Sequence, residues 1–153
     1  MGPLHCSLVD SIRQMLPADV PAVSELIRST LELDYSMDTY LAMFSFWPAG
    51  AIVAERAGEV VGFLGAVIQA EGEARILVFA VHPHHRGQGI GSSLLREFLI
   101  RCSGNGVRIV TLEVRESNRA AIRFYEKNGF QPVEFIEKCY SDGEGGYRMV
   151  LWL

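Results

Sequence analysis

The chain has 153 residues, about the length of one domain, and a formal net charge of −4. Hydrophobic residues make up 49% of it and charged residues 21%, which is typical of a globular protein and excludes a disordered chain. Apolar stretches such as residues 76–81 have the length of a strand, so the sequence predicts neither a membrane span nor a secretory signal. Three widely spaced cysteines favour a reducing compartment over a disulfide framework, and we therefore expect a cytoplasmic protein.

The first half of the chain predicts one strand, two helices and an antiparallel meander. A short strand is expected at residues 12–15, and Pro17 stands near the start of a helix whose apolar residues recur at helical spacing up to Leu31. A second short helix ends before Pro48. Tight turns separate the three strands of the meander, Ala51–Arg56, Glu59–Gln69 and Ala74–Val81.

The second half begins with a glycine-rich segment, residues 85–91, that leads into a helix. A strand over Val107–Val114 follows, and then a helix that Ser117 or Asn118 can cap and Gly129 ends. The last two strands, Phe130–Tyr140 and Tyr147–Leu153, form a hairpin in which Tyr147, Met149 and Leu151 share one side of the final strand.

These elements follow the order β-α-α-β-β-β-α-β-α-β-β. That order predicts an α/β fold with a mixed, mostly antiparallel sheet of six to seven strands flanked by about four helices. We expect a single domain over residues 1–153, with residues 1–10 as a loose N-terminal extension.

The charge is unevenly distributed along the chain. Residues 1–74 carry 3 basic and 10 acidic side chains, whereas residues 75–127 carry 9 basic and 4 acidic ones. Because binding to a phosphate backbone usually needs a basic face, the acidic balance argues against nucleic acid as a partner. A basic middle suits a small anionic ligand there and a cationic substrate elsewhere, and scattered surface charge is the alternative.

The glycine-rich segment has the composition of a phosphate-binding turn. Gly87, Gly89 and Gly91 lack Cβ atoms, so a phosphate can approach the backbone N–H groups at the start of the helix, and Arg86 and Ser92 add polar donors. The spacing fits neither a dinucleotide fingerprint nor a Walker loop. A flexible turn that merely precedes a helix is the alternative.

Two motifs together resemble a known family. Arg86-x-x-Gly89-x-Gly91 directly follows a strand, and Asn118-x-x-Ala121-x-x-Phe124-Tyr125-x-x-x-Gly129-Phe130 lies on the next helix. The pair resembles the acetyl-CoA site of the GNAT superfamily of N-acetyltransferases, and the likeness extends from Ile12 to Leu153. Residues 111–115, followed by the Asn118 helix, are similar to the RimI-like branch, which acetylates protein α-amino groups.

The resemblance implies acetyl-CoA as cosubstrate and no metal; the histidines at positions 82, 84 and 85 make a poor zinc site. The pyrophosphate would lie on the amides of the turn, and the pantetheine arm would lie as a pseudo-strand between the strands Ala74–Val81 and Val107–Val114. The implied cofactor-binding residues are Phe79, Ala80, Val81, Arg86, Gly87, Gln88, Gly89, Ile90, Gly91, Ser92, Asn118 and Tyr125.

Direct attack of an amine on a thioester requires a neutral amine, a donor to the oxyanion and an acid for the leaving thiolate. By resemblance Glu113 is the base and Tyr125 the acid, and the N–H of Val81 is our candidate oxyanion donor. The structural alternatives are a solvated carboxylate at a strand end for Glu113 and core packing for Tyr125.

The acceptor is expected to be a peptide or protein N-terminus. By resemblance the segment with Leu33 and Tyr35 covers the peptide, and the turn that begins at Tyr140 offers it a hydroxyl and carboxylates; Cys139 stands where this branch commonly has tyrosine. A small-molecule amine as acceptor, or a non-catalytic acyl-CoA-binding module, are the alternative functions. We expect no nucleic-acid or membrane partner, and a monomer or weak homodimer.

Overall fold

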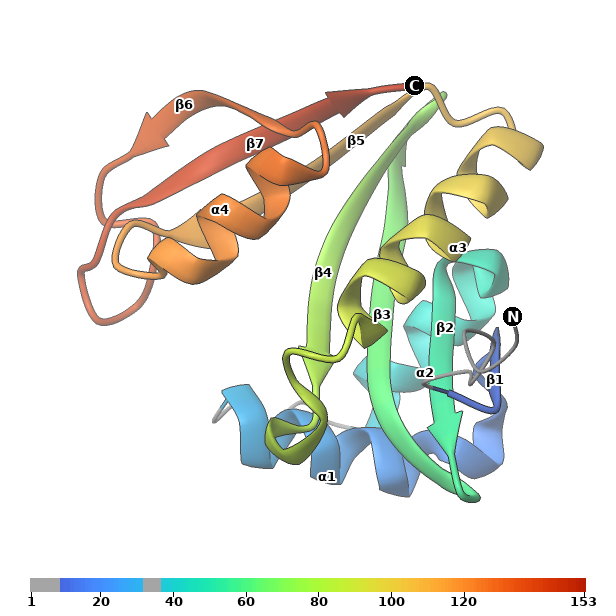
Figure 1. The fold of residues 1–153 in the computed structure, drawn as a ribbon. Helices are drawn as coiled ribbons and strands as arrows, with labels where there is room; N and C mark the ends of the chain where they lie inside the picture. Colours follow the sequence, from blue (N-terminus) through green and yellow to red (C-terminus); the bar gives the residue numbers. More distant parts are fainter. Residues whose placement is uncertain (1–8, 32–36) are drawn as a thin grey trace, which may run out of the picture. The chain divides into compact units, whose positions relative to one another are not determined.

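The computed structural model describes residues 9–31 and 37–153 (Figure 1). The strands are β1 (Ser11–Gln14), β2 (Ala51–Arg56), β3 (Glu59–Ala70), β4 (Glu73–Val81), β5 (Ile109–Arg115), β6 (Gln131–Ile136) and β7 (Gly146–Trp152). The α-helices are α1 (Val20–Leu31), α2 (Met37–Phe46), α3 (Ile90–Gly104) and α4 (Arg119–Lys127). The expected fold class and order of elements are confirmed.

The strands form one sheet in the order β1-β2-β3-β4-β5-β7-β6. β4 and β5 are parallel, while β1–β2, β2–β3, β5–β7 and β6–β7 are antiparallel. The chain divides into two compact units, Met1–Val67 with Leu77–Asn105, and Ile68–Ile76 with Gly106–Leu153. No helix of the described residues is both long and apolar enough to cross a membrane.

In the first unit, α1 and α3 are amphipathic helices with fully buried stripes. The buried residues of α1 are Val20, Val23, Leu26 and Ile27, and those of α3 are Ile90, Leu94, Leu95, Phe98 and Cys102. Each buried aliphatic side chain contributes roughly 1.5–3 kcal/mol relative to exposure. Gly62 of β3 lets α3 approach closely, because a Cβ there would lie 2.8 Å from Leu94 Cδ1. This packing fixes where α3 begins.

In the second unit, α4 lies against β5 and β7 (Figure 1). Tyr147 and Met149 of β7 face the groove that Ile122 of α4 lines, while Arg148, Val150 and Trp152 line a pocket on the other side of the strand. The expected alternation of the last strand is therefore confirmed.

The penultimate strand is shorter than the sequence predicts. The prediction placed it over Phe130–Tyr140, but β6 ends at Ile136. Lys138 adopts a left-handed φ of 51°, which a ladder of extended residues does not accommodate. The chain therefore leaves the sheet before Tyr140, and Tyr140 lies in the loop that joins β6 to β7.

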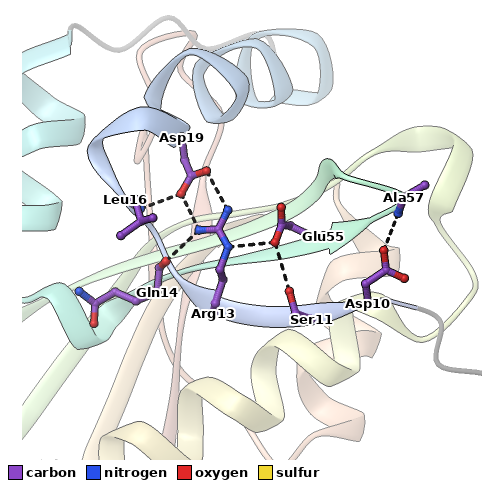
Figure 2. A network of polar contacts seen from close by, with 8 residues as sticks. All are labelled: Asp10, Ser11, Arg13, Gln14, Leu16, Asp19, Glu55 and Ala57. Atoms are coloured by element: carbon purple, nitrogen blue, oxygen red, sulfur yellow. Dashed lines mark hydrogen bonds and ion pairs between the residues drawn. The ribbon is translucent and has the colours of Figure 1, made fainter.

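An ion-pair network anchors β1 to its neighbours (Figure 2). The Arg13 guanidinium donates to both carboxylate oxygens of Asp19, at 2.7 and 2.9 Å, and to Glu55 Oε1 of β2 at 2.9 Å. Asp19 also accepts the amide of Leu16 at 2.7 Å. The pKa values of Asp19 and Glu55 are both lowered, in each case first by the hydrogen bond from Arg13.

We expect Asp19→Asn to lower the Tm by roughly 3–6 °C at pH 7, because it removes a bidentate, charge-assisted contact. Because the pKa of Asp19 is lower in the folded protein, the ionised carboxylate stabilises the fold at pH values above the ordinary carboxyl pKa. This stabilisation is lost as the pH falls through the pKa of the folded state. The difference in Tm between the two proteins should therefore shrink below about pH 4.

Differential scanning calorimetry from pH 3 to 8 measures this difference. Glu25→Gln is the matched control, because the Glu25–Arg28 pair is exposed on α1 and should change the Tm by less than about 1 °C. An unchanged Tm for Asp19→Asn at pH 7 would contradict the stabilising role of the network.

Candidate active site

The turn between β4 and α3 presents a run of backbone amides without backbone acceptors. The Arg86 amide donates to Pro83 O at 3.4 Å, and the Ser93 amide donates to Gly89 O at 3.0 Å. Among the described residues, none accepts a backbone hydrogen bond from the amides between them, Gly87 to Ser92. Gly87 and Gly89 make this path possible with φ values of 74° and 83°.

These amides stand at the N-terminus of a 15-residue helix, where the peptide dipoles add a partial positive charge. Free donors and positive potential together form an anion site suited to phosphate groups. The free backbone amides of the turn therefore fit the pyrophosphate of a CoA-type ligand.

Side chains hold the turn in place from both ends. Arg86 Nε donates to Val81 O at the end of β4, at 3.1 Å, and Gln88 Oε1 accepts from Arg56 Nη1 of β2, at 2.6 Å. The side chain of Gln88 is therefore tied to the sheet, which leaves its backbone amide as the group that can donate to a ligand.

In the second unit, Asn118 caps α4. Its Oδ1 accepts from the Ala121 amide at 3.2 Å, so the cap predicted at Ser117 or Asn118 falls on Asn118. This bond uses only the carbonyl half of the side-chain amide, and no residue in 9–31 or 37–153 accepts a hydrogen bond from the Nδ2 half.

Tyr125 lies on α4 among aromatic rings, with centroids 5.4 Å from Phe124 and 5.5 Å from Phe130. Burial raises the pKa of its hydroxyl well above the usual range, and the neighbouring Tyr140 raises it further. The hydroxyl therefore stays protonated at neutral pH, as a proton donor must.

Glu113 lies on the opposite face of β5 from α4. Its side chain is 14% exposed and lines a pocket of about 570 Å³ together with Thr111 and Cys139. Arg75 of β4 contacts Glu113 Oε1, and Arg148 Nε of β7 lies 3.8 Å from Glu113 Oε2. Arg75 and Arg148 were not among the predicted site residues; only the strand register identifies them.

The loop between β6 and β7 is folded around Arg115. Arg115 Nη1 contacts Asp142 Oδ2 and Glu144 Oε1, each at 2.8 Å, and its guanidinium lies 4.2 Å from the ring centre of Tyr140. Glu144 Oε2 also accepts the Ser117 amide at 3.0 Å. These two carboxylates hold the loop itself, and the expectation that they and the Tyr140 hydroxyl are offered to a peptide stays a prediction.

Tyr140 interacts electrostatically with both predicted catalytic residues, Glu113 and Tyr125. Burial raises the pKa of Tyr140 to about 12, and the negative charge of Glu113 contributes in the same direction. Tyr140 in turn raises the pKa of Tyr125. Tyr140 is therefore within electrostatic range of both Glu113 and Tyr125.

The remaining predicted site residues fall into two groups. Phe79, Ala80 and Val81 form the last three positions of β4 in the first unit. Leu33 and Tyr35 lie outside the described residues.

The model of the acetyltransferase (GNAT) family matches residues 20–130 of the chain, which is more than half of its length. The chain belongs to the GNAT acetyltransferase family. The expected family and the enzyme class, an acyltransferase, are confirmed.

Relatives of this acetyltransferase belong to the family branch that acetylates protein N-termini. The putative ribosomal protein bS18-alanine N-acetyltransferase of Bacillus subtilis is 30% identical over 144 residues, 94% of either chain. The N-alpha-acetyltransferase of Sulfurisphaera tokodaii is 30% identical over 90% of either chain. The crystal structure of Ard1 from Thermoplasma volcanium is 36% identical and has a TM-score of 0.89, covering 94% of this chain and 97% of that one.

Gly89→Ala should weaken CoA binding by at least about tenfold, because it adds a Cβ beside the free amides and strains a positive φ. Isothermal titration calorimetry with CoA measures this. Gly58→Ala is the matched control: its φ of 79° imposes the same strain, and its Cβ meets nothing within 4 Å. Equal affinities for the two variants would show that the turn does not bind the phosphates.

Tyr125→Phe should lower kcat of the acetyltransferase by about 10²-fold with little change in Tm, because it keeps the ring and removes the proton donor. Since the pKa of Tyr125 is raised, wild-type kcat should show no loss from this group up to about pH 10. Tyr147→Phe is the matched control in the same unit, on a ring that packs on Phe135. A kcat for Tyr125→Phe equal to that of the control would assign Tyr125 to packing.

Proposed function

We propose that this acetyltransferase transfers the acetyl group of acetyl-CoA to the α-amino group of a protein N-terminus. The observation that carries the donor half of the proposal is the run of free amides from Gly87 to Ser92. The acceptor half is supported by the relatives in Bacillus subtilis and Sulfurisphaera tokodaii, which are named as a putative ribosomal protein bS18-alanine N-acetyltransferase and an N-alpha-acetyltransferase.

Residue roles follow from the chemistry of each group. In the first unit, the turn amides would hold the pyrophosphate, residues 79–81 would pair with the pantetheine arm, and the Val81 N–H would donate to the developing oxyanion. In the second unit, Asn118 Nδ2 would donate to the cofactor. Bound acetyl-CoA supplies the acetyl group as a thioester, which is activated toward attack by an amine.

Glu113 and Tyr125 would handle the two protons of the reaction. An α-amine has an ordinary pKa near 8, so a weak general base is sufficient to deprotonate it and make it a nucleophile. The Glu113 carboxylate would accept the proton of the amine. Tyr125 stays protonated because burial raises its pKa, and it would donate to the leaving thiolate. Tyr140 offers its hydroxyl to the peptide, and we place Leu33 and Tyr35 beside the same peptide.

The free thiols fit a reducing compartment, and we place the enzyme in the cytoplasm. Cys102 is fully buried on α3, and burial raises its pKa to about 12, which keeps it in the unreactive thiol form. Cys139 is also unpaired.

Peptides that differ only in which amine is free test the acceptor. One peptide carries a free α-amine and arginine in place of lysine; its twin has a blocked α-amine and one lysine. With acetyl-CoA and the enzyme, we expect acetylation of the first peptide at least about 100-fold faster than of the second, with mass spectrometry locating the added group.

Three results would decide against the proposal. Acetylation mainly on lysine, or only of small amines such as polyamines, would assign the enzyme another acceptor. CoA binding without transfer to any amine would make the protein an acyl-CoA-binding module.

A further inference from the structure

Four charged side chains form a ladder of alternating sign across the second unit: Arg75 on β4, Glu113 on β5, Arg148 on β7 and Glu134 on β6. Glu113 lies directly opposite Arg148, and Arg148 directly opposite Glu134. Arg75 lies opposite Thr111, two residues before Glu113 and therefore on the same face of the sheet.

The contacts along this ladder are unequal. Arg75 Nη2 contacts Glu113 Oε1 directly, whereas Arg148 Nε lies 3.8 Å from Glu113 Oε2 and Arg148 Nη1 contacts Glu134 Oε1 at 2.8 Å. Arg148 is thus shared between two carboxylates. Arg75 Nε is buried and has no partner among the described residues, so the polar contact of Arg75 is its ion pair with Glu113.

We propose that Arg75 is a positioning residue for the proposed transfer, which holds the Glu113 carboxylate aimed into the pocket that both residues line. The proposal rests on the role of Glu113 given above. The guanidinium contacts one of the two oxygens of a carboxylate that is only 14% exposed, so the rotamer of Glu113 is set before an amine arrives.

The groups that face Glu113 come from β4, β6, β7 and the loop before β7. They are Glu73, Arg75, Glu134, Cys139, Tyr140 and Arg148. Only Arg75 and Arg148 among them carry positive charge, and Arg148 has Glu134 as a closer partner. On β5 itself, Arg115 lies two residues from Glu113 and is paired with Asp142 and Glu144. Removing Arg75 therefore leaves the Glu113 carboxylate without the guanidinium that contacts it directly.

A purely structural role would look different. Cross-strand ion pairs on an open sheet face contribute little to stability, and their loss would change activity to the same extent whether or not Glu113 is present. The two roles are separated by a double-mutant cycle.

The experiment measures kcat/KM at pH 7.5 for wild type, Arg75→Gln, Glu113→Gln and the double variant, with the amine that wild type acetylates fastest. We expect Arg75→Gln to lose about tenfold, because the Glu113 carboxylate is no longer held toward the pocket. In the Glu113→Gln background, Arg75→Gln should change kcat/KM by less than about twofold. Arg75→Lys, which keeps a positively charged donor, should restore most of the loss.

Arg148→Gln is the matched control and should lose less than Arg75→Gln, because its contact with Glu113 is longer. A loss for Arg75→Gln that persists in the Glu113→Gln background would overturn the proposal, as would no loss at all. Failure of the acceptor assignment is seen separately, since it changes which amine wild type acetylates and leaves this cycle measurable.

Discussion

Two glycines with positive φ, Gly87 and Gly89, shape the start of α3, where the amides from Gly87 to Ser92 have no backbone acceptor in the described part of the chain. A side chain at Gly87 or Gly89 would strain the backbone. A capping side chain that accepted hydrogen bonds from these N–H groups would occupy the donors that a phosphate needs. The buried stripe of α3 fixes where the helix begins, and Gly62 lets it pack closely on β3. The cofactor assignment depends on this conformation more than on any charged side chain.

The two predicted catalytic groups lie in different surroundings. Tyr125 lies among aromatic rings, and burial raises its pKa and keeps its proton. Glu113 is 14% exposed and contacts the Arg75 guanidinium. A buried hydroxyl and a carboxylate held by a guanidinium suit the roles of acid and base that we propose for them.

The sequence was sufficient to predict the elements whose signals are local. The glycine spacing of the turn, the cap at Asn118 and the alternation along β7 depend on neighbouring residues, and all are found in the structure. Contacts between distant residues were not predictable in the same way. Arg75 and Glu113 are 38 residues apart and meet only through the register of the parallel pair β4–β5, which the sequence does not specify.

The loop before β7 shows the same limit. The sequence of this loop resembles a family motif, but the motif does not indicate which side chains form the contacts that hold the loop. Asp142 and Glu144 both bind Arg115, a contact that the motif does not predict. The end of β6 at Ile136 follows from the left-handed φ of Lys138, a conformation that lysine rarely adopts and that composition does not indicate.

Amide chemical shifts test the central claim most directly. In a 15N–1H titration of the labelled protein with CoA, the account predicts saturable shifts of the amides from Gly87 to Ser92 as they begin to donate to phosphate oxygens, with the Gly58 amide unchanged as an internal reference. Pantetheine, which lacks the pyrophosphate and the 3′-phosphoadenosine of CoA, should leave the turn amides unshifted. Saturable CoA binding that leaves the amides of Gly87 to Ser92 unmoved would contradict the account.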